Sequence, residues 1–172
     1  LARAIAEQAA TQLEHTLLYQ ETLALAKQQV EMEIARKVQL QLLPQSRPQA
    51  ADLDIFAESR PALQVGGDFY DYVAEPGRPL ILLLGDVVGK GMSAALIMGM
   101  IHAVTRSAMR FMPDSTPASV LRRTNHDLYD ELNLLESFAT LFVAQYESKN
   151  KLLRYANAGH APVMYRPPGG KA

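Results

Sequence analysis

Cysteine is absent from this chain of 172 residues. Its absence excludes disulfide bonds, thiolate nucleophiles and cysteine-based zinc sites, and it is compatible with a reducing cytoplasm. An excess of either charge is also lacking, because 17 Lys and Arg residues accompany 18 Asp and Glu residues. No general attraction to nucleic acid or to an anionic membrane follows from such a balance. No apolar run approaches the roughly 20 residues of a membrane span.

The composition is that of a soluble globular protein, with 48% hydrophobic and 20% charged residues. The length fits one domain plus an appendage and is sufficient to bury a core. The chain begins at Leu1 without a methionine and ends in the segment 167–172, which is rich in Pro and Gly. We therefore expect it to be a piece of a longer protein.

Residues 1–43 lack Gly and Pro and are rich in Ala, Leu, Gln, Glu and Lys, which predicts one long helix. Its two heptad core positions are only partly apolar. A weak parallel coiled coil that makes a homodimer is one interpretation, and an amphipathic helix packed on its own domain is the other. We expect 1–43 to be a signalling or linker helix, at the tail of an upstream sensor, and 44–172 to be a separate domain.

The remaining chain mixes strand and helix patterns. Alternating or strongly apolar segments predict strands over 52–60, 65–74, 79–87, 138–147, 151–158 and 161–166. Helices are predicted over 92–112 and 116–133, with Pro113 ending the first and Ser115 or Thr116 capping the second. Strands followed by two helices and further strands predict an α+β layered domain with antiparallel pairing.

The most specific local feature is a predicted hairpin with a Gly-Asp pair in each strand. If its turn centres on Gly77, then Asp68 and Asp86 are equidistant from the turn. In that register the two carboxylates lie opposite one another on the same face, with Cβ atoms about 5 Å apart. A change of one residue in the turn would offset them.

Two carboxylates this close repel each other unless a cation compensates, and hard Mg²⁺ or Mn²⁺ ions prefer such oxygen ligands. Nearby glycines would let the backbone approach an ion or a phosphate closely. These glycines are Gly66, Gly67, Gly85, Gly89 and Gly91. The alternative is a purely structural role, in which each aspartate lies in a turn beside its glycine. A phosphate-binding P-loop at 84–91 is excluded, because its first glycine and its Ser or Thr are missing.

Four ordered segments together resemble a known family. They are Val65–Asp71, Gly85–Gly91, Phe138–Val143 and Tyr155–Pro162. The first two resemble the metal motifs of the PPM (PP2C-like) serine/threonine phosphatases, in particular the bacterial SpoIIE/RsbU branch that regulates sigma factors. The resemblance covers roughly residues 35–166.

The resemblance implies a PP2C-like β-sandwich flanked by helices in α-β-β-α layers, incomplete here, with two Mn²⁺ or Mg²⁺ ions at one edge. It implies that Asp86 bridges both ions, that Asp68 binds one, and that the Val87 backbone carbonyl is a further ligand. In that family the ions hold and acidify the water that attacks the phosphoester. Substrates are typically phosphoserine or phosphothreonine on anti-sigma-factor antagonist proteins.

This sequence also departs from the family pattern. Val88 stands where the branch usually has a small residue, and the family's further metal aspartates would follow the last matching segment, where this chain stops. We therefore expect an active parent protein but weak Mn²⁺ binding and poor turnover from these residues alone. The alternative is a catalytically degenerate module used for binding or dimerisation.

Other polar residues near the motifs allow two interpretations each. Three of them are candidate substrate-binding residues: Arg60 could reach the substrate phosphate, Lys90 could contact the phosphoprotein, and His160 could act as a general acid. A surface role for Arg60 and a structural role for His160 are the simpler interpretations. Asp71 lies three residues after Asp68 and thus on the opposite strand face, which predicts a solvated carboxylate or an outer-sphere role.

Overall fold

The computed structural model describes residues 2–48, 52–112 and 114–166. Pro113, which was expected to end a helix, lies outside the described residues. Two compact units form, one from residues 1–38 and one from residues 39–172.

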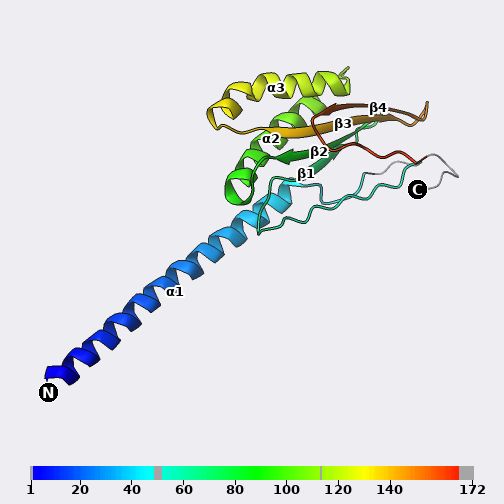
Figure 1. The fold of residues 1–172 in the computed structure, drawn as a ribbon. Coiled ribbons are helices and arrows are strands. Elements are labelled where there is room, and N and C mark those ends of the chain that lie inside the picture. Colours follow the sequence, from blue (N-terminus) through cyan, green and yellow to red (C-terminus); the bar gives the residue numbers. More distant parts are fainter. Residues whose placement is uncertain (1, 49–51, 113, 167–172) are drawn as a thin grey trace. The chain divides into compact units, whose positions relative to one another are not determined.

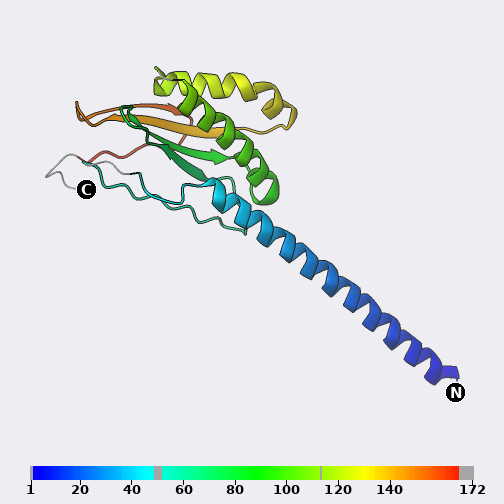
Figure 2. The same ribbon diagram turned by 180° about the vertical axis from the view of Figure 1, so that it is seen from behind.

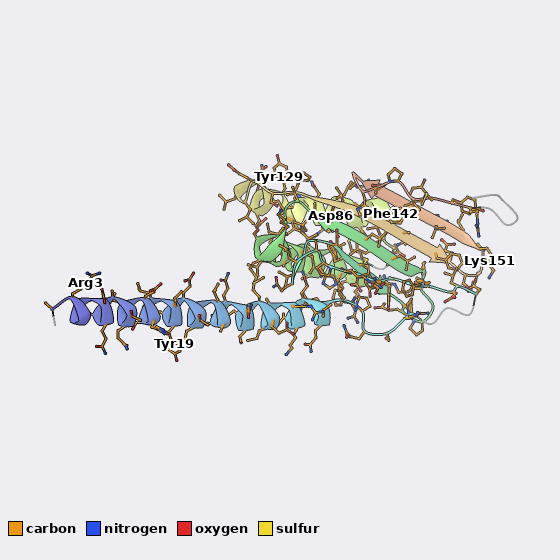
Figure 3. All side chains as sticks on the ribbon, turned by 60° about the horizontal axis from the view of Figure 1, so that its bottom comes forward. Arg3, Tyr19, Asp86, Tyr129, Phe142 and Lys151 are labelled. Atoms are coloured by element: carbon orange, nitrogen blue, oxygen red, sulfur yellow. The ribbon has the colours of Figure 1, made fainter. Side chains whose placement is uncertain are left out.

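The first unit is a single helix. The helix α1 spans Ala2–Leu42, which confirms the long helix predicted for this region, and its last four residues belong to the second unit. Its large apolar side chains are mostly exposed, among them Leu13, Leu17 and Ile34. Figure 3 labels Arg3 and Tyr19, which both project from this helix. Within the described parts of the chain, no helix has the length and apolarity that crossing a membrane requires.

The second unit is built on one antiparallel sheet. Its strands are β1 (Phe69–Val73), β2 (Leu80–Val87), β3 (Ala139–Glu147) and β4 (Leu152–Ala158), in the spatial order β1-β2-β3-β4 (Figure 1). Sequence neighbours therefore pair along the whole sheet. Tight turns close the β1–β2 and β3–β4 hairpins, because the Arg78 N–H bonds the Glu75 carbonyl and the Lys151 N–H bonds the Ser148 carbonyl.

Two helices cover one face of this sheet. The helix α2 spans Gly91–Phe111 and packs on β1 and β2, whereas α3 spans Pro117–Leu134 and packs on β3 and β4 (Figures 1 and 2). The hydroxyl of Thr116 accepts from the Ser119 N–H at 3.2 Å, and the Ser119 hydroxyl accepts from the Thr116 N–H at 2.8 Å. This reciprocal capping confirms the predicted start of the second helix.

The core lies between the helices and the sheet. Alternate strand residues point into it, so that Ile81, Leu83 and Val87 of β2 are buried while Leu84 on the opposite face is 40% exposed. Met98 and Met109 of α2 are fully buried in this core. The α+β class and the antiparallel pairing are thus confirmed, and the described residues form one sheet with helices on one of its faces.

Three strand predictions need correction. Residues 52–60 form no strand, and β1 begins at Phe69 rather than at residue 65. Asp52, at the start of this segment, instead accepts hydrogen bonds from the side chains of Tyr146, Ser148 and Lys151 in the β3–β4 hairpin. Residues 161–166 also lie outside the strands, because Gly159 turns the chain with a φ of +72° and Pro162 lacks an N–H for pairing.

Candidate metal centre

The strand register brings Asp68 and Asp86 together. Phe69 pairs with Gly85, and beyond that pair the Val87 N–H bonds the Gly67 carbonyl at 3.4 Å. Asp68 and Asp86 lie between these two pairs and are therefore opposite one another, which confirms the predicted register. Both side chains are on the sheet face away from α2 and α3, and Figure 3 labels Asp86 at its place on β2.

Among the described residues, no ion pair joins Asp68 or Asp86 to a basic side chain. Partial burial and then the hydrogen bond and negative charge of Asp86 raise the pKa of the Asp68 carboxyl, while the nearby His160 acts in the opposite direction. Repulsion between paired carboxylates is the condition that a divalent cation relieves. The pair is thus suited to cation binding at one end of the paired strands β1 and β2.

Glycine is required at three positions around the pair. A Cβ atom on Gly67 would lie 2.6 Å from the Val87 carbonyl oxygen, so only glycine allows this carbonyl to lie against the start of β1. Gly89, in the loop after β2, and Gly91, the first residue of α2, have φ angles of +97° and +73°, which side chains disfavour.

Glycine is required at residue 85 for a different physical reason from the one expected. A Cβ atom there would lie 2.3 Å from Cε1 of Phe69 and 2.8 Å from Cδ2 of Leu141. Gly85 therefore makes room for the Phe69 ring in the core beneath the helices, and close packing accounts for it without an ion or a phosphate.

His160 approaches the pair from the end of β4. Its Nδ1 lies 2.8 Å from the Thr140 hydroxyl, and Thr140 is the β3 partner of Asp86 in the register. A small cavity of about 220 Å³ is lined by both Asp68 and His160, together with Arg60 and its ion-pair partner Glu58. The fold thus brings two of the three candidate substrate residues to the aspartates.

Lys90 is placed differently. It is exposed at the N-cap position of α2, in extended conformation, and its side chain makes no capping hydrogen bond. It does not line the cavity beside Asp68. Arg60 is 82% exposed and bonds Glu58 at 2.8 Å, consistent with a surface arginine.

The prediction that Asp71 is a solvated strand carboxylate is wrong. Asp71 is 1% exposed, because α2 covers the face of β1 that it occupies. Its carboxylate bonds both the Arg106 guanidinium and, at 3.1 Å, the Nε2 of the buried His102. Burial alone would raise the pKa of Asp71, but the bonds from His102 and Arg106 outweigh it and lower the pKa.

A signal for this cluster was present in the sequence. His102 and Arg106 are one helical turn apart in an apolar helix, and Asp71 has the strand parity of the buried residues Phe69 and Val73. A helix with two basic groups on one face needs an acidic partner when that face is buried.

The site supplies hard oxygen ligands for a divalent cation, and in that respect it fits Mn²⁺ or Mg²⁺. The oxygens that could serve are the carboxylates of Asp68 and Asp86 and the main-chain carbonyl of Val87, which a side chain on Gly67 would crowd. Across residues 2–48, 52–112 and 114–166, no cluster of three or more His, Cys, Asp or Glu side chains could hold an ion. The described residues thus provide a partial coordination shell.

The layering and the paired aspartates define a class, the PP2C-like domains. A solved structure, the SiaA-PP2C domain of Pseudomonas aeruginosa, superimposes with a TM-score of 0.67 at 25% sequence identity. The match covers 78% of this chain and 55% of that chain. The fold therefore agrees with the one that the sequence motifs implied.

The family is narrower than the class. The family model for stage II sporulation protein E (SpoIIE) matches residues 76–172, which is more than half of the chain. This chain belongs to the SpoIIE family. Asp86 and the segment 155–162 lie inside the matched region, whereas Asp68 precedes it.

Two curated proteins are similar over most of this chain. The phosphoserine phosphatase RsbU of Bacillus subtilis (strain 168) is 38% identical over 137 residues, covering 78% of this chain and 39% of RsbU. Protein IcfG of a Synechocystis strain is 31% identical over 159 residues, covering 78% of this chain and 25% of IcfG. The chain thus spans about two fifths or less of the length of these relatives.

Proposed function

We propose that this chain carries part of a metal-dependent protein serine/threonine phosphatase. The observation that carries the proposal is the register that sets Asp68 opposite Asp86 at one end of the paired strands β1 and β2. Similarity to a phosphoserine phosphatase, RsbU, supports the same reaction class. The register of the aspartates or the similarity to RsbU alone would be weaker support for this reaction, because one fold can serve several functions.

The chain's own residues would hold the cation and leave room for substrate. The carboxylates of Asp68 and Asp86 would hold the Mn²⁺ or Mg²⁺ ions, and the Val87 carbonyl would add a further oxygen. When bound, such ions lower the pKa of water and offset the charge of a phosphate ester. Gly67 keeps the Val87 carbonyl free of side-chain contact, and the glycines after Asp86 shape the loop that follows.

The proposed substrate is a phosphoserine or phosphothreonine on a bacterial regulatory protein of the anti-sigma-factor antagonist type. Arg60 and His160 line the cavity beside Asp68 and would contact the phosphoryl group of this substrate. Lys90, exposed at the start of α2, would meet the surrounding protein surface instead. The paired aspartates would bind the substrate phosphate only through a cation, since a bare phosphate would be repelled.

We expect these 172 residues alone to bind Mn²⁺ weakly and to turn over poorly. The described residues offer only two carboxylates and one carbonyl, whereas Mn²⁺ and Mg²⁺ sites require about six ligands. The same shortage keeps the alternative of a degenerate binding module open for the isolated chain. Robust phosphatase activity from the isolated chain would contradict the expectation of impairment.

Calorimetric titration with Mn²⁺ tests the metal site directly. We expect saturable binding by the chain, and its loss in the double variant Asp68→Asn, Asp86→Asn. The matched control is Asp130→Asn, which removes an exposed carboxylate on α3 and should leave binding unchanged. Equal binding by the double variant and the unaltered chain would contradict the proposed site.

The proposal includes a homodimer formed through α1. Large apolar side chains are exposed along residues 13–38, Leu17 at 60% and Ile34 at 56% among them, and such a stripe is suited to a helical partner. We expect the double variant Leu17→Glu, Ile34→Glu to be monomeric in analytical ultracentrifugation. An unaltered chain that sediments as a monomer at about 100 μM, far above the Kd of a stable coiled coil, would contradict the dimer.

A further inference from the structure

The turn after β4 is held in place by one side chain. Asn157 accepts a hydrogen bond from the His160 N–H at 2.7 Å and donates one to the His160 carbonyl at 3.1 Å. Gly159, between them, has a φ of +72° that favours glycine. The backbone of His160 is thereby fixed by Asn157, and this turn contributes nothing to the sheet ladder beyond a single bridge.

The ring of His160 is held by a second contact. Thr140 places its hydroxyl 2.8 Å from Nδ1, and Thr140 is the residue across from Asp86 on the neighbouring strand. One ring nitrogen is therefore occupied, and no hydrogen-bond partner is found for the other, Nε2, among the residues that the structure describes. His160 is partly exposed and lines the cavity beside Asp68.

The cavity beside His160 has the size and the donors for a phosphoryl group. Its volume of about 220 Å³ corresponds to several water molecules at about 30 Å³ each. The polar residues that line it are Glu58, Ser59, Arg60, Asp68, Tyr70 and His160. The Ser59 hydroxyl already donates to the Asp68 backbone carbonyl at 3.3 Å. Glu58 already pairs with Arg60, and Asp68 would be neutralised by the proposed cation.

We propose that His160 contacts the phosphoryl group of the substrate through a hydrogen bond donated by Nε2. In this arrangement the Thr140 hydroxyl donates to Nδ1, which fixes the tautomer with its proton on Nε2. Thr140 and Asn157 are positioning residues for the ring and the backbone, respectively. The inference rests on the proposed function, because the aspartates must hold a cation before phosphate can bind there.

The tautomer can be measured on the chain without metal. We expect the ring nitrogen spectrum of ¹⁵N-labelled protein to show a protonated Nε2 and an unprotonated Nδ1 for His160. The variant Thr140→Val removes the hydroxyl at nearly constant volume and should abolish this preference. A proton on Nδ1 in the unaltered chain would overturn the inference, since Nε2 would then have nothing to donate.

Phosphate binding provides the second test, with inorganic phosphate as the probe in the presence of saturating Mn²⁺. We expect His160→Ala to weaken phosphate binding by about tenfold or more while Mn²⁺ affinity stays unchanged. His160→Gln, which keeps an N–H donor near the position of Nε2, should recover part of the loss. The control His126→Ala removes an exposed histidine on α3 and should have no effect.

The outcomes separate the two proposals. Mn²⁺ binding with equal phosphate affinity in His160→Ala and the unaltered chain would overturn this inference alone. Absence of Mn²⁺ binding by the unaltered chain would overturn the proposed function and this inference with it.

Discussion

Two aspartates of the same motif, three residues apart, have opposite surroundings. Asp71 points into the layer between the sheet and α2, where His102 and Arg106 bond its carboxylate. Asp68 points to the other face of the sheet, where the group that faces it is a second carboxylate, Asp86. The pKa of Asp71 is lowered and that of Asp68 is raised.

This contrast separates a structural carboxylate from a candidate ligand. The protein itself neutralises Asp71, which therefore has no need of an external cation. Asp68 and Asp86 lack such a partner among the described residues, and a pair left in this condition is a candidate functional site. One hairpin thus carries a stabilising acid on one face and a destabilising pair on the other.

The largest loss of stability is expected from breaking the buried cluster of Asp71, His102 and Arg106. Asp71→Ala leaves His102 and part of Arg106 buried without an anion, which should cost about 3 kcal/mol of unfolding free energy. Urea denaturation measures this loss. The matched control is Asp127→Ala, which breaks the surface pair with Arg123 and should cost less than about 0.5 kcal/mol. Equal losses in the two variants would show that the cluster is not a stabilising element.

Acid should remove the stabilisation that Asp71 provides. Its pKa is lowered in the folded state from the ordinary value of 3.8, so the ionised carboxylate stabilises the fold above that value. The contribution is then lost as the pH falls below 3.8 and through the lowered pKa of the folded state. We therefore expect the difference in unfolding free energy between the unaltered chain and Asp71→Asn to shrink below pH 3.8. A difference that stays constant down to pH 2 would contradict this assignment.

The smallest change in stability, a gain and not a loss, is expected from Asp68 on the opposite face of the sheet. Asp68→Asn removes the repulsion with Asp86 and should stabilise the metal-free chain at pH 7 by less than about 1 kcal/mol, because solvent screens the exposed pair. A carboxylate with a raised pKa destabilises the fold when ionised, so the gain should disappear as the pH falls through that pKa. Thermal unfolding with a metal chelator present measures it, and a clear loss of stability at pH 7 would contradict the repulsion.

Much of the site could be predicted because hairpin pairing is local. The symmetry of the chain about Gly77 was sufficient to place Asp68 opposite Asp86, and a turn of few residues leaves little freedom in register. The start of α3 followed equally from local chemistry, since Thr116 and Pro117 both favour a helix N-terminus. The family motifs pointed to the same pair of aspartates independently of the hairpin geometry.

Other features depended on contacts between distant parts of the chain. Whether Asp71 meets water or Arg106 is decided by which face α2 covers, and strand parity alone leaves the two faces equivalent. The alternating segment 52–60 forms no strand, and Asp52 at its start bonds side chains of the distant β3–β4 hairpin. Likewise, only the folded chain brings His160 beside Thr140 and the Asp68 cavity.

The sequence by itself thus determined the long helix, the hairpin register and the pair of facing aspartates, since these depend on propensity, periodicity and short turns. Only the tertiary structure decided which carboxylate is neutralised, why Gly85 must be glycine and which histidine reaches the site. The physical reason is that burial and charge compensation are set by packing between segments distant in sequence. Local patterns alone do not decide which distant segment supplies the partner of a side chain.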